Sequence, residues 1–400
     1  MYYTILFVYP SVFNPQLGGI ERVTDLLARA FIRKGHNVLY LHLRRIHDAD
    51  CLDYRYPAPV FFFPEENIDS ETNKDFYHKF LLDHHVDFII NQCGNFGDSR
   101  LFLDIPIDNG IKTISVLHSD PLLNYKHLSN EILCRKNNTK IEYLKLLLRI
   151  IFFPKIKINY KRRRIEHFKY LFNHTDAICL LSQIHIDSIN EIYKGNKKTK
   201  INVIPNPCSF SPLSNVPHKK KQLLYVGRLE KGEKRPDRLL KIWSYLYKKY
   251  PDWILVIVGD GKQRAILEKR ARNMERVLFV GYADPRQYYI ESSIFCMTSN
   301  YEGMPMVLLE TMCFGTIPVA FKSFASVTDV ITDKKNGLLV PPFSIKSYAE
   351  KIEYLINNEP IRLNMAKADI ESVKRYTIDS IIEQWETLFA KLKGRSSRDV

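Results

Sequence analysis

The chain has 400 residues, of which 45% are hydrophobic and 26% charged, and its formal net charge is +15. This length fits two domains of about 200 residues each, and the proportions exclude both a disordered protein and a membrane-spanning one. The charge predicts an anionic partner, and nucleotide phosphates, nucleic acid or an acidic membrane surface would each satisfy it.

Two features bear on the compartment. The N-terminal stretch MYYTILFVYP has no basic flank and an apolar run much shorter than the roughly 20 residues of a membrane span, so we expect neither a signal peptide nor an anchor, and a cytoplasmic protein. The cysteines are odd in number and form no Cys-x-x-Cys pair, which favours buried thiols over disulfides or zinc ligands. They are Cys51, Cys93, Cys134, Cys179, Cys208, Cys296 and Cys313.

The first half of the chain alternates short apolar runs with helix-length segments. Such runs are typical of strands that are buried on both faces of a parallel sheet. They are TILFVYP, NVLYLHL, VDFIINQ, TISVLHS and AICLLS. The pattern predicts a doubly wound α/β domain over residues 1–205.

The densest basic segment is YLKLLLRIIFFPKIKINYKRRR, residues 143–164, which contains no acidic residue. A helix of this composition has a broad apolar face flanked by cations, as in segments that lie in the headgroup region of an anionic membrane. The other interpretation is a core helix followed by a solvated basic turn. We favour the membrane because LLLRIIFF is more apolar than one buried face requires.

The second half repeats this organisation with the runs QLLYVGRL, WILVIVGDG, RVLFVGYA, IFCMTS and TIPVAF. A stretch rich in Pro, Ser and Asn precedes them, and it predicts a linker over residues 206–217. The second doubly wound domain is expected over residues 218–375. Residues 376–400 are expected to form a C-terminal helix, with packing against the first domain as one expectation, and a tail. Ligands of such sheets bind at the carboxyl ends of the strands.

Two glutamates flank a predicted helix start in YEGMPMVLLE. Pro305 suits the first helical position and Gly315 a left-handed stop after Phe314. Glu302 then precedes the helix and Glu310 lies on its second turn. The free N–H groups of a helix N-terminus bind anions, and carboxylates accept hydrogen bonds from hydroxyls, so this segment predicts a site for a nucleotide sugar. For an isolated pair, a helix-end charge and a solvent-facing glutamate is the alternative.

Several separate stretches resemble the retaining glycosyltransferases of family 4, which have the GT-B fold. They are LGGIERV, VLHSD, VIPNP, YVGRLEKGEKRPDRLL, VIVGDGKQRAILE, SNYEGMPMVLLETMCFGTIPVA and DKKNGLLVPP, in the family's order. The Glu-x7-Glu segment is the most specific of them. The resemblance implies two Rossmann-like domains that face each other across a cleft, with the acceptor in the first and the nucleotide sugar in the second.

Carried over by position, the resemblance assigns Arg228 and Lys234 to the donor diphosphate and Glu310 to the ribose hydroxyls. In the usual spacing of the family the lysine stands where this chain has Glu233, so Lys234 requires one inserted residue, and Lys231 is the alternative. A fixed Arg and Lys beside a helix N-terminus would stabilise the charge that develops on the leaving phosphate.

The resemblance also assigns Glu302 to hydroxyls of the donor sugar, with the N–H groups of Gly303 and Met304 close to the sugar or phosphate. His118, after the strand TISVL, would hydrogen-bond a sugar hydroxyl, although a lone histidine is more often structural. Gly18 and Gly19 would form a tight turn near a phosphate or the acceptor, or simply a turn. The expected catalytic residues are His118, Arg228, Lys234 and Glu302.

The resemblance implies transfer, with retention, from a nucleotide sugar, most simply a UDP-sugar, to a lipid-linked saccharide or polysaccharide precursor of the cell surface. A GT-B sugar-nucleotide epimerase and a non-catalytic membrane-associated sugar-nucleotide-binding protein are the alternatives. We expect a peripheral location on the inner face of the plasma membrane through residues 143–164. No nucleic-acid motif is found. No cofactor or divalent metal is expected, because the triplet Asp48 to Asp50 lies in a polar loop far from the donor motifs.

Overall fold

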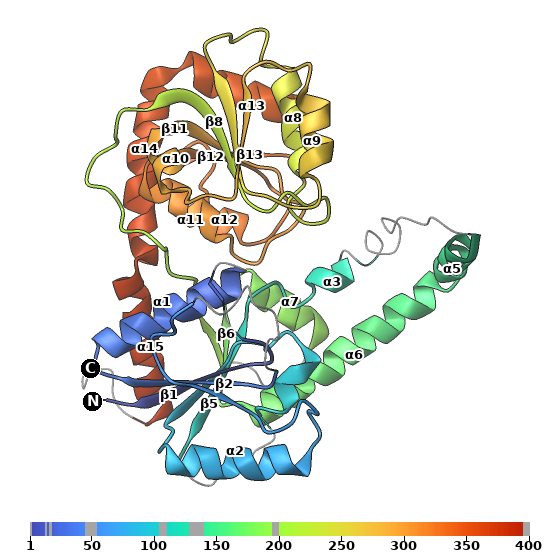
Figure 1. Cartoon of the computed structure of the whole chain (residues 1–400), viewed down its shortest axis with the longest axis vertical. Coiled ribbons are helices and arrows are strands. Elements are labelled where there is room, and N and C mark those ends of the chain that lie inside the picture. Colours follow the sequence, from blue (N-terminus) through green and yellow to red (C-terminus); the bar gives the residue numbers. More distant parts are fainter. Residues whose placement is uncertain are drawn as a thin grey trace. The chain divides into compact units, whose positions relative to one another are not determined.

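The computed structural model describes residues 2–12, 14–15, 18–44, 54–103, 110–126, 128, 140–193 and 200–394. The chain divides into two compact units, each described here by itself (Figure 1). Unit 1 comprises Met1–Ile204 and Trp385–Val400, and unit 2 comprises Pro205–Gln384.

Unit 1 contains a seven-stranded parallel sheet with the order β3-β2-β1-β4-β5-β6-β7. The strands are β1 (Thr4–Tyr9), β2 (Asn37–His42), β3 (Val60–Phe62), β4 (Phe88–Asn91), β5 (Lys112–Leu117), β6 (Ala177–Leu180) and β7 (Ile201–Val203). The five expected strands form the centre of the sheet. The sequence pattern does not predict the edge strands β3 and β7, because three residues are too few for alternation or continuous burial to emerge.

Helices cover both faces of this sheet (Figure 1). Helix α2 (Glu71–Asp83) packs on one face, where Tyr77 and Phe80 join the β1 and β2 core. Helix α1 (Gly19–Arg33) lies on the other face with α15 (Ile378–Leu392), and Phe31 and Phe389 meet there with their ring centroids 5.5 Å apart. Short elements complete the unit: α3 (Leu123–Lys126), α7 (His185–Ile192) and a 3-10 turn η2 (Gly97–Arg100).

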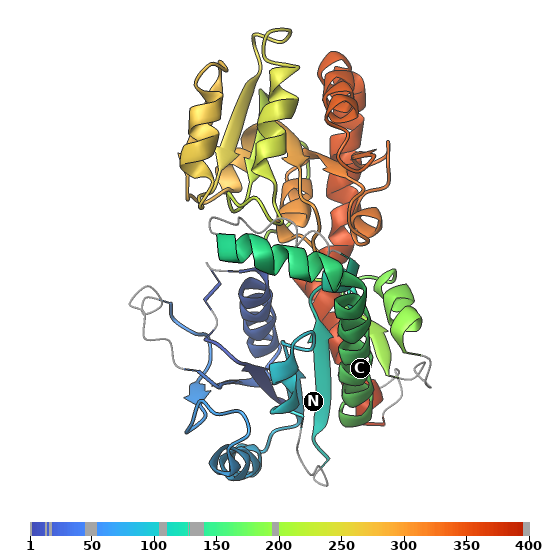
Figure 2. The ribbon, with the colours of Figure 1, turned by 90° about the vertical axis from the view of Figure 1, so that its right-hand side faces the viewer.

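The basic apolar segment forms two helices, α5 (Lys140–Ile151) and α6 (Phe153–His174), and not one. Phe152 separates them, and Pro154 lies in the first turn of α6, where a missing N–H is tolerated. Only the C-terminal part of α6 joins the core, through Phe168, Leu171 and Phe172. Figure 2 shows α5 lying across the N-terminal end of α6.

Unit 2 contains a six-stranded parallel sheet with the order β10-β9-β8-β11-β12-β13. The strands are β8 (Lys220–Val226), β9 (Ile254–Val258), β10 (Val277–Gly281), β11 (Ser292–Met297), β12 (Ile317–Phe321) and β13 (Leu338–Val340). Five were expected, and β13 is again a short edge strand. Two parallel, Rossmann-like sheets with helices therefore confirm the predicted fold class.

The helices of unit 2 lie on both faces of its sheet (Figure 1). Helices α8 (Pro236–Ser244), α9 (Arg264–Ala271) and α13 (Ile345–Asn357) pack against a core that includes Trp243, Leu255 and Ile294. Helices α10 (Arg286–Glu291) and α11 (Met306–Cys313) lie on the opposite face. The remaining helices are α12 (Val327–Val330), α14 (Glu359–Val373) and η3 (Lys374–Tyr376).

The chain around the expected linker differs from the prediction. Residues 206–217 belong to unit 2, where the Cys208 N–H donates to the Tyr376 carbonyl (2.7 Å) and the Leu213 N–H to the Cys313 carbonyl (2.9 Å). The chain returns to unit 1 at Trp385 and not at residue 376. Pro, Ser and Asn therefore indicate irregular backbone here, but hydrogen bonds to unit 2 make that backbone part of a folded unit.

Among the described residues the cysteines are free and buried, and Cys51 and Cys134 lie outside that part of the chain. The Sγ atoms of Cys208 and Cys313 lie 3.0 Å apart. None of the helices in the described ranges is both long and apolar enough to cross a membrane.

Candidate functional site

The strand order of unit 2 brings two distant loops together. The chain continues from β8 to β9 on one side, whereas β11 pairs with β8 on the other, so the order reverses between β8 and β11. Ligands of doubly wound sheets bind outside the carboxyl ends of the strands at such a reversal. Arg228 and Lys234 follow β8, and Glu302 follows β11. The topology thus places the expected donor residues at one edge of the sheet.

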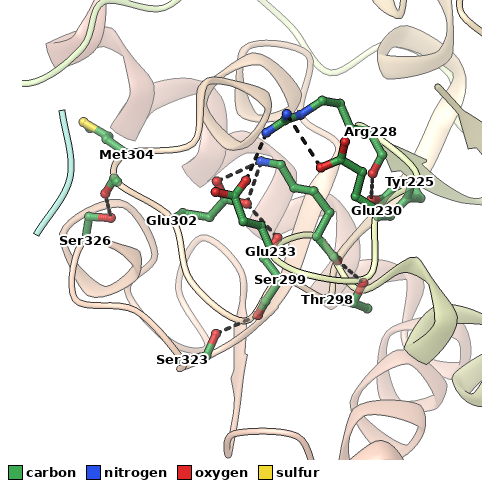
Figure 3. A network of polar contacts seen from close by, with 12 residues as sticks. Tyr225, Arg228, Glu230, Glu233, Thr298, Ser299, Glu302, Met304, Ser323 and Ser326 are labelled. Carbon is green, nitrogen blue, oxygen red and sulfur yellow. Dashed lines mark hydrogen bonds and ion pairs between the residues drawn. The ribbon is translucent and has the colours of Figure 1, made fainter. Parts of the chain in front are cut away.

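Lys234 and Glu302 form the centre of this site (Figure 3). The Lys234 Nζ lies 2.8 Å from each carboxylate oxygen of Glu302, and the Ser299 hydroxyl donates to Oε1 (2.7 Å). The Lys234 side chain is 20% exposed and that of Glu302 10% exposed. The pair is therefore shielded but open on one side, with hydrogen-bonding capacity left on both partners.

Backbone contacts hold the two loops in register. The Thr298 hydroxyl donates to the carbonyls of Lys234 (3.2 Å) and Arg235 (3.0 Å). The Asn300 N–H donates to the Glu233 carbonyl, and its side-chain amide to the Gly232 carbonyl, both at 2.7 Å. These contacts pre-organise the loops that carry Lys234 and Glu302. The sequence does not single out Ser299 or Thr298, because a Ser or Thr after a strand has many ordinary roles.

Arg228 lies at the exposed side of the same network, 56% exposed, with its guanidinium 3.0 Å from Glu233 and 3.7 Å from Glu230 (Figure 3). The alternative lysine, Lys231, is exposed in the turn between them. Each of the cations Arg228 and Lys234 is thus matched by carboxylates in this structure. A diphosphate entering here has to compete with Glu230, Glu233 and Glu302 for these cations.

Glycines allow the loops after β8 and β9 to pack backbone to backbone. A Cβ on Gly259 would collide with the Gly227 carbonyl oxygen, and one on Gly261 would lie 2.9 Å from the Leu229 N and O atoms. Both glycines also have φ above +130°. This packing supports the strand end from which Arg228 projects.

Helix α11 begins one residue later than expected, at Met306, with Pro305 at the N-cap, and it ends at Cys313, before Gly315 at φ +65°. Pro305 precedes the helix because its ψ of 115° is extended. The Gly303 carbonyl accepts from the Ser326 hydroxyl. Met304 is buried, and its carbonyl accepts from the Asn206 amide (3.3 Å).

Glu310 lies on α11, but it is fully buried. Its Oε1 accepts from the Ser209 hydroxyl and its Oε2 from the Tyr289 hydroxyl, both at 2.8 Å. In this structure the carboxylate therefore links α11 to the 206–217 segment and to α10. A ribose would reach it only if one of these hydroxyls gave way. The sequence could not indicate this, because Ser209 and Tyr289 are far from Glu310 along the chain.

The remaining expected residues lie in unit 1. Gly18 is the N-cap of α1, in extended backbone, and the Glu21 carboxylate occupies the place that a Cβ of Gly18 would take. A Cβ on Gly19 would meet no described atom within 4 Å. Gly18 is thus required by a close contact, whereas Gly19 is not constrained in this way.

His118 follows β5, and its Nε2 lies 2.6 Å from Oε1 of Gln92, which follows β4. Burial lowers the pKa of His118 to about 4, so the imidazole is neutral at neutral pH. Gln92 is buried, and the sequence analysis missed it because nothing local marks it. The two side chains lie on neighbouring strands, next to the point where the strand order of unit 1 reverses.

Arg164 has a structural role that the sequence did not indicate. Its guanidinium donates to the carbonyls of Asn95 (2.8 Å) and Pro121 (2.9 Å), and so joins the loops after β4 and β5. Arg162 and Arg163 on the same helix are exposed. The basic segment therefore does not present all of its cations to one surface.

Within the described ranges, no group of three or more His, Cys, Asp or Glu side chains is arranged to hold a metal ion. Asp48 and Asp50 lie outside the described residues.

Two family models match the chain. The model described as "Glycosyltransferase Family 4" matches residues 17–210, and the one described as "Glycosyl transferases group 1" matches residues 210–372. The two matches together cover both units.

Curated relatives point the same way. A protein of Haemophilus influenzae named "Uncharacterized glycosyltransferase" is 35% identical over 224 residues, which are 54% of this chain and 62% of that protein. A Campylobacter jejuni protein, named as an α-1,4-N-acetyl-D-galactosaminyltransferase that acts on a diNAcBac-PP-undecaprenol-linked saccharide, is 28% identical over 225 residues, 55% of this chain and 61% of that protein. The chain thus matches about three fifths of the length of these relatives.

Among solved structures, TarM of S. aureus in complex with Fondaparinux, α-GlcNAc-glycerol and UDP has a TM-score of 0.71 over 97% of this chain and 99% of that one. The sequence identity of 16% makes this a likeness of fold.

Proposed function

Because this chain belongs to the group 1 glycosyltransferases of family 4, we propose that it transfers a sugar from a nucleoside-diphosphate sugar to a saccharide acceptor in cell-surface glycan biosynthesis. The observation that carries this proposal is the joining of the Lys234 loop and the Glu302 loop at the strand-order reversal of unit 2. Cations for a diphosphate and a carboxylate for sugar hydroxyls meet there.

The residues have distinct roles in the proposed reaction. Arg228 and Lys234 bind the diphosphate and stabilise the charge that develops on it as the sugar departs. Glu302 accepts hydrogen bonds from hydroxyls of the donor sugar, with Gly303 and Met304 beside it. Lys234 keeps Glu302 ionised and in place, and its third N–H can turn toward a phosphate.

The proposed donor is a UDP-sugar, and the proposed outcome is retention of the anomeric configuration. UDP is bound by TarM, a neighbour in fold. In a front-face displacement the leaving phosphate accepts the proton of the incoming hydroxyl, so no carboxylate nucleophile is required. Glu310 is proposed to contact the ribose after one of its two hydroxyl partners turns away.

The proposed acceptor is a lipid-linked saccharide, as the name of the Campylobacter relative states for that protein. The surface of α5 and α6 supports this proposal. Ile151 and Ile158 are each 68% exposed. Other large apolar side chains exposed on the same segment are Leu147, Leu148, Ile150 and Phe152.

Cations flank this apolar surface. A groove of about 750 Å³ between Tyr125 and α6 is lined by apolar and basic side chains. The Nζ atoms of Lys157 and Lys161 lie 5.2 and 5.9 Å from the centroid of the Tyr125 ring. Apolar side chains between cations suit the interface of an anionic membrane. We therefore propose a peripheral location on an anionic leaflet.

A panel of nucleotide sugars tests the proposal. The matching donor should raise the Tm of the full chain, and the protein should then hydrolyse it slowly and transfer its sugar to a lipid-linked acceptor. Release of an altered sugar without any acceptor would identify an epimerase instead. Binding without turnover in the presence of acceptor would identify a non-catalytic protein.

A further inference from the structure

Gln92 is a buried polar residue that the proposed mechanism does not use. Its backbone N–H donates to the Val8 carbonyl (3.2 Å), which fixes it beside β1, and its side-chain Oε1 meets the His118 Nε2 at 2.6 Å. Among the described residues its amide Nε2 has no hydrogen-bond partner. A buried, half-satisfied amide weakens folding relative to an apolar side chain of similar size. Its presence therefore points to its contact with His118.

The chemistry of the contact defines the state of the imidazole. An amide oxygen only accepts, so the His118 Nε2 must carry the proton. Burial of His118 disfavours the imidazolium, and the ring is neutral with an unprotonated Nδ1. The charged groups on the neighbouring loops are engaged elsewhere, since Asp120 pairs with Lys126 (2.7 Å) and Arg164 donates to backbone carbonyls.

We propose that Gln92 is a positioning residue, which holds His118 as the Nε2-protonated tautomer so that Nδ1 accepts a hydrogen bond from a sugar hydroxyl. This inference rests on the proposed function for the sugar, but the tautomer itself does not. A neighbouring contact fixes the loop that follows β5, because the Asn95 amide donates to the hydroxyl of Ser119, the residue after His118 (2.9 Å).

The tautomer is tested directly by long-range ¹H–¹⁵N spectra of the full chain labelled in histidine, with His118→Asn to identify the signals. At neutral pH the wild type should show a protonated Nε2 and an unprotonated Nδ1. Gln92→Met should allow both tautomers. Gln92→Glu should keep the wild-type tautomer and raise the pKa of His118, because a carboxylate then faces the ring. A protonated Nδ1 in the wild type, or an unshifted His118 pKa in Gln92→Glu, would overturn the proposal.

Kinetics test the consequence. Gln92→Met should lower kcat about tenfold, the value of one hydrogen bond. Gln92→Glu should restore much of it above its new His118 pKa, with the acid limb of the pH profile moved to higher pH. The exposed Gln287→Met on α10 is the matched control and should leave kcat unchanged. Equal kcat for Gln92→Met and wild type would remove the role in transfer. If no donor is turned over, the proposed function fails, and the spectra still decide the tautomer.

Discussion

Lys234 and Glu302 lie 68 positions apart in the chain, yet the ammonium of one lies 2.8 Å from both carboxylate oxygens of the other. Loss of either partner leaves a shielded charge without its counter-ion. We expect Lys234→Met and Glu302→Gln each to lower kcat/KM about a hundredfold, on the order of 3 kcal/mol. In the double variant the losses should not add, since the two side chains act as a unit. A full double-mutant cycle measures this, and strict additivity would contradict it.

Arg228 is half exposed and its ion pairs are at the surface, so it contributes little to folding. Arg228→Ala should keep the wild-type Tm and lower kcat about a hundredfold through loss of a charged phosphate contact. Lys231→Ala in the same turn is the matched control, with a small effect expected. A larger loss of kcat in Lys231→Ala than in Arg228→Ala would reverse the assignment of these two residues.

Glu310 combines a proposed ribose contact with two buried hydrogen bonds. Glu310→Ala should therefore lower the Tm and weaken donor binding, with a smaller effect on kcat, because a ribose contact is made in both the ground and the transition state. Tyr289→Phe removes one of the hydrogen bonds and should lower the Tm without weakening donor binding. Unchanged donor affinity in Glu310→Ala would leave this carboxylate a purely structural role.

Membrane binding is tested best without Arg164, because that side chain joins two loops of unit 1. Changing Arg162 and Arg163 to Ser should reduce sedimentation with anionic vesicles, at about 1 kcal/mol per residue. Activity on a soluble acceptor should remain. The exposed pair Lys269 and Arg270 on α9, changed to Ser, controls for net charge. Equal loss of binding in both variants would show that only net charge matters.

We expect the reaction to proceed without a divalent metal. Arg228, Lys234 and the N-terminus of α11 provide the positive charge in this proposal. Because carboxylates already pair with both cations, the diphosphate has to displace them. Activity should persist in excess EDTA, and Asp48→Asn with Asp50→Asn should leave kcat near wild type. Loss of activity in EDTA that Mn²⁺ restores would overturn this expectation.

The central strands and the Glu-x7-Glu segment were predictable, since each depends on residues that are neighbours in the chain. Continuous apolar runs indicate buried parallel strands, and Gly315 takes its left-handed conformation as expected. The short edge strands β3, β7 and β13 were missed because they carry too few residues for a pattern.

The sequence by itself determined the class of fold, the order of its elements and which residue types stand at the strand ends. Only the tertiary structure decided which of them meet: Lys234 with Glu302, Glu310 with Ser209 and Tyr289, and His118 with Gln92. The physical reason is that strand order and side-chain packing bring together residues far apart in the chain, and local sequence patterns carry no record of those distances.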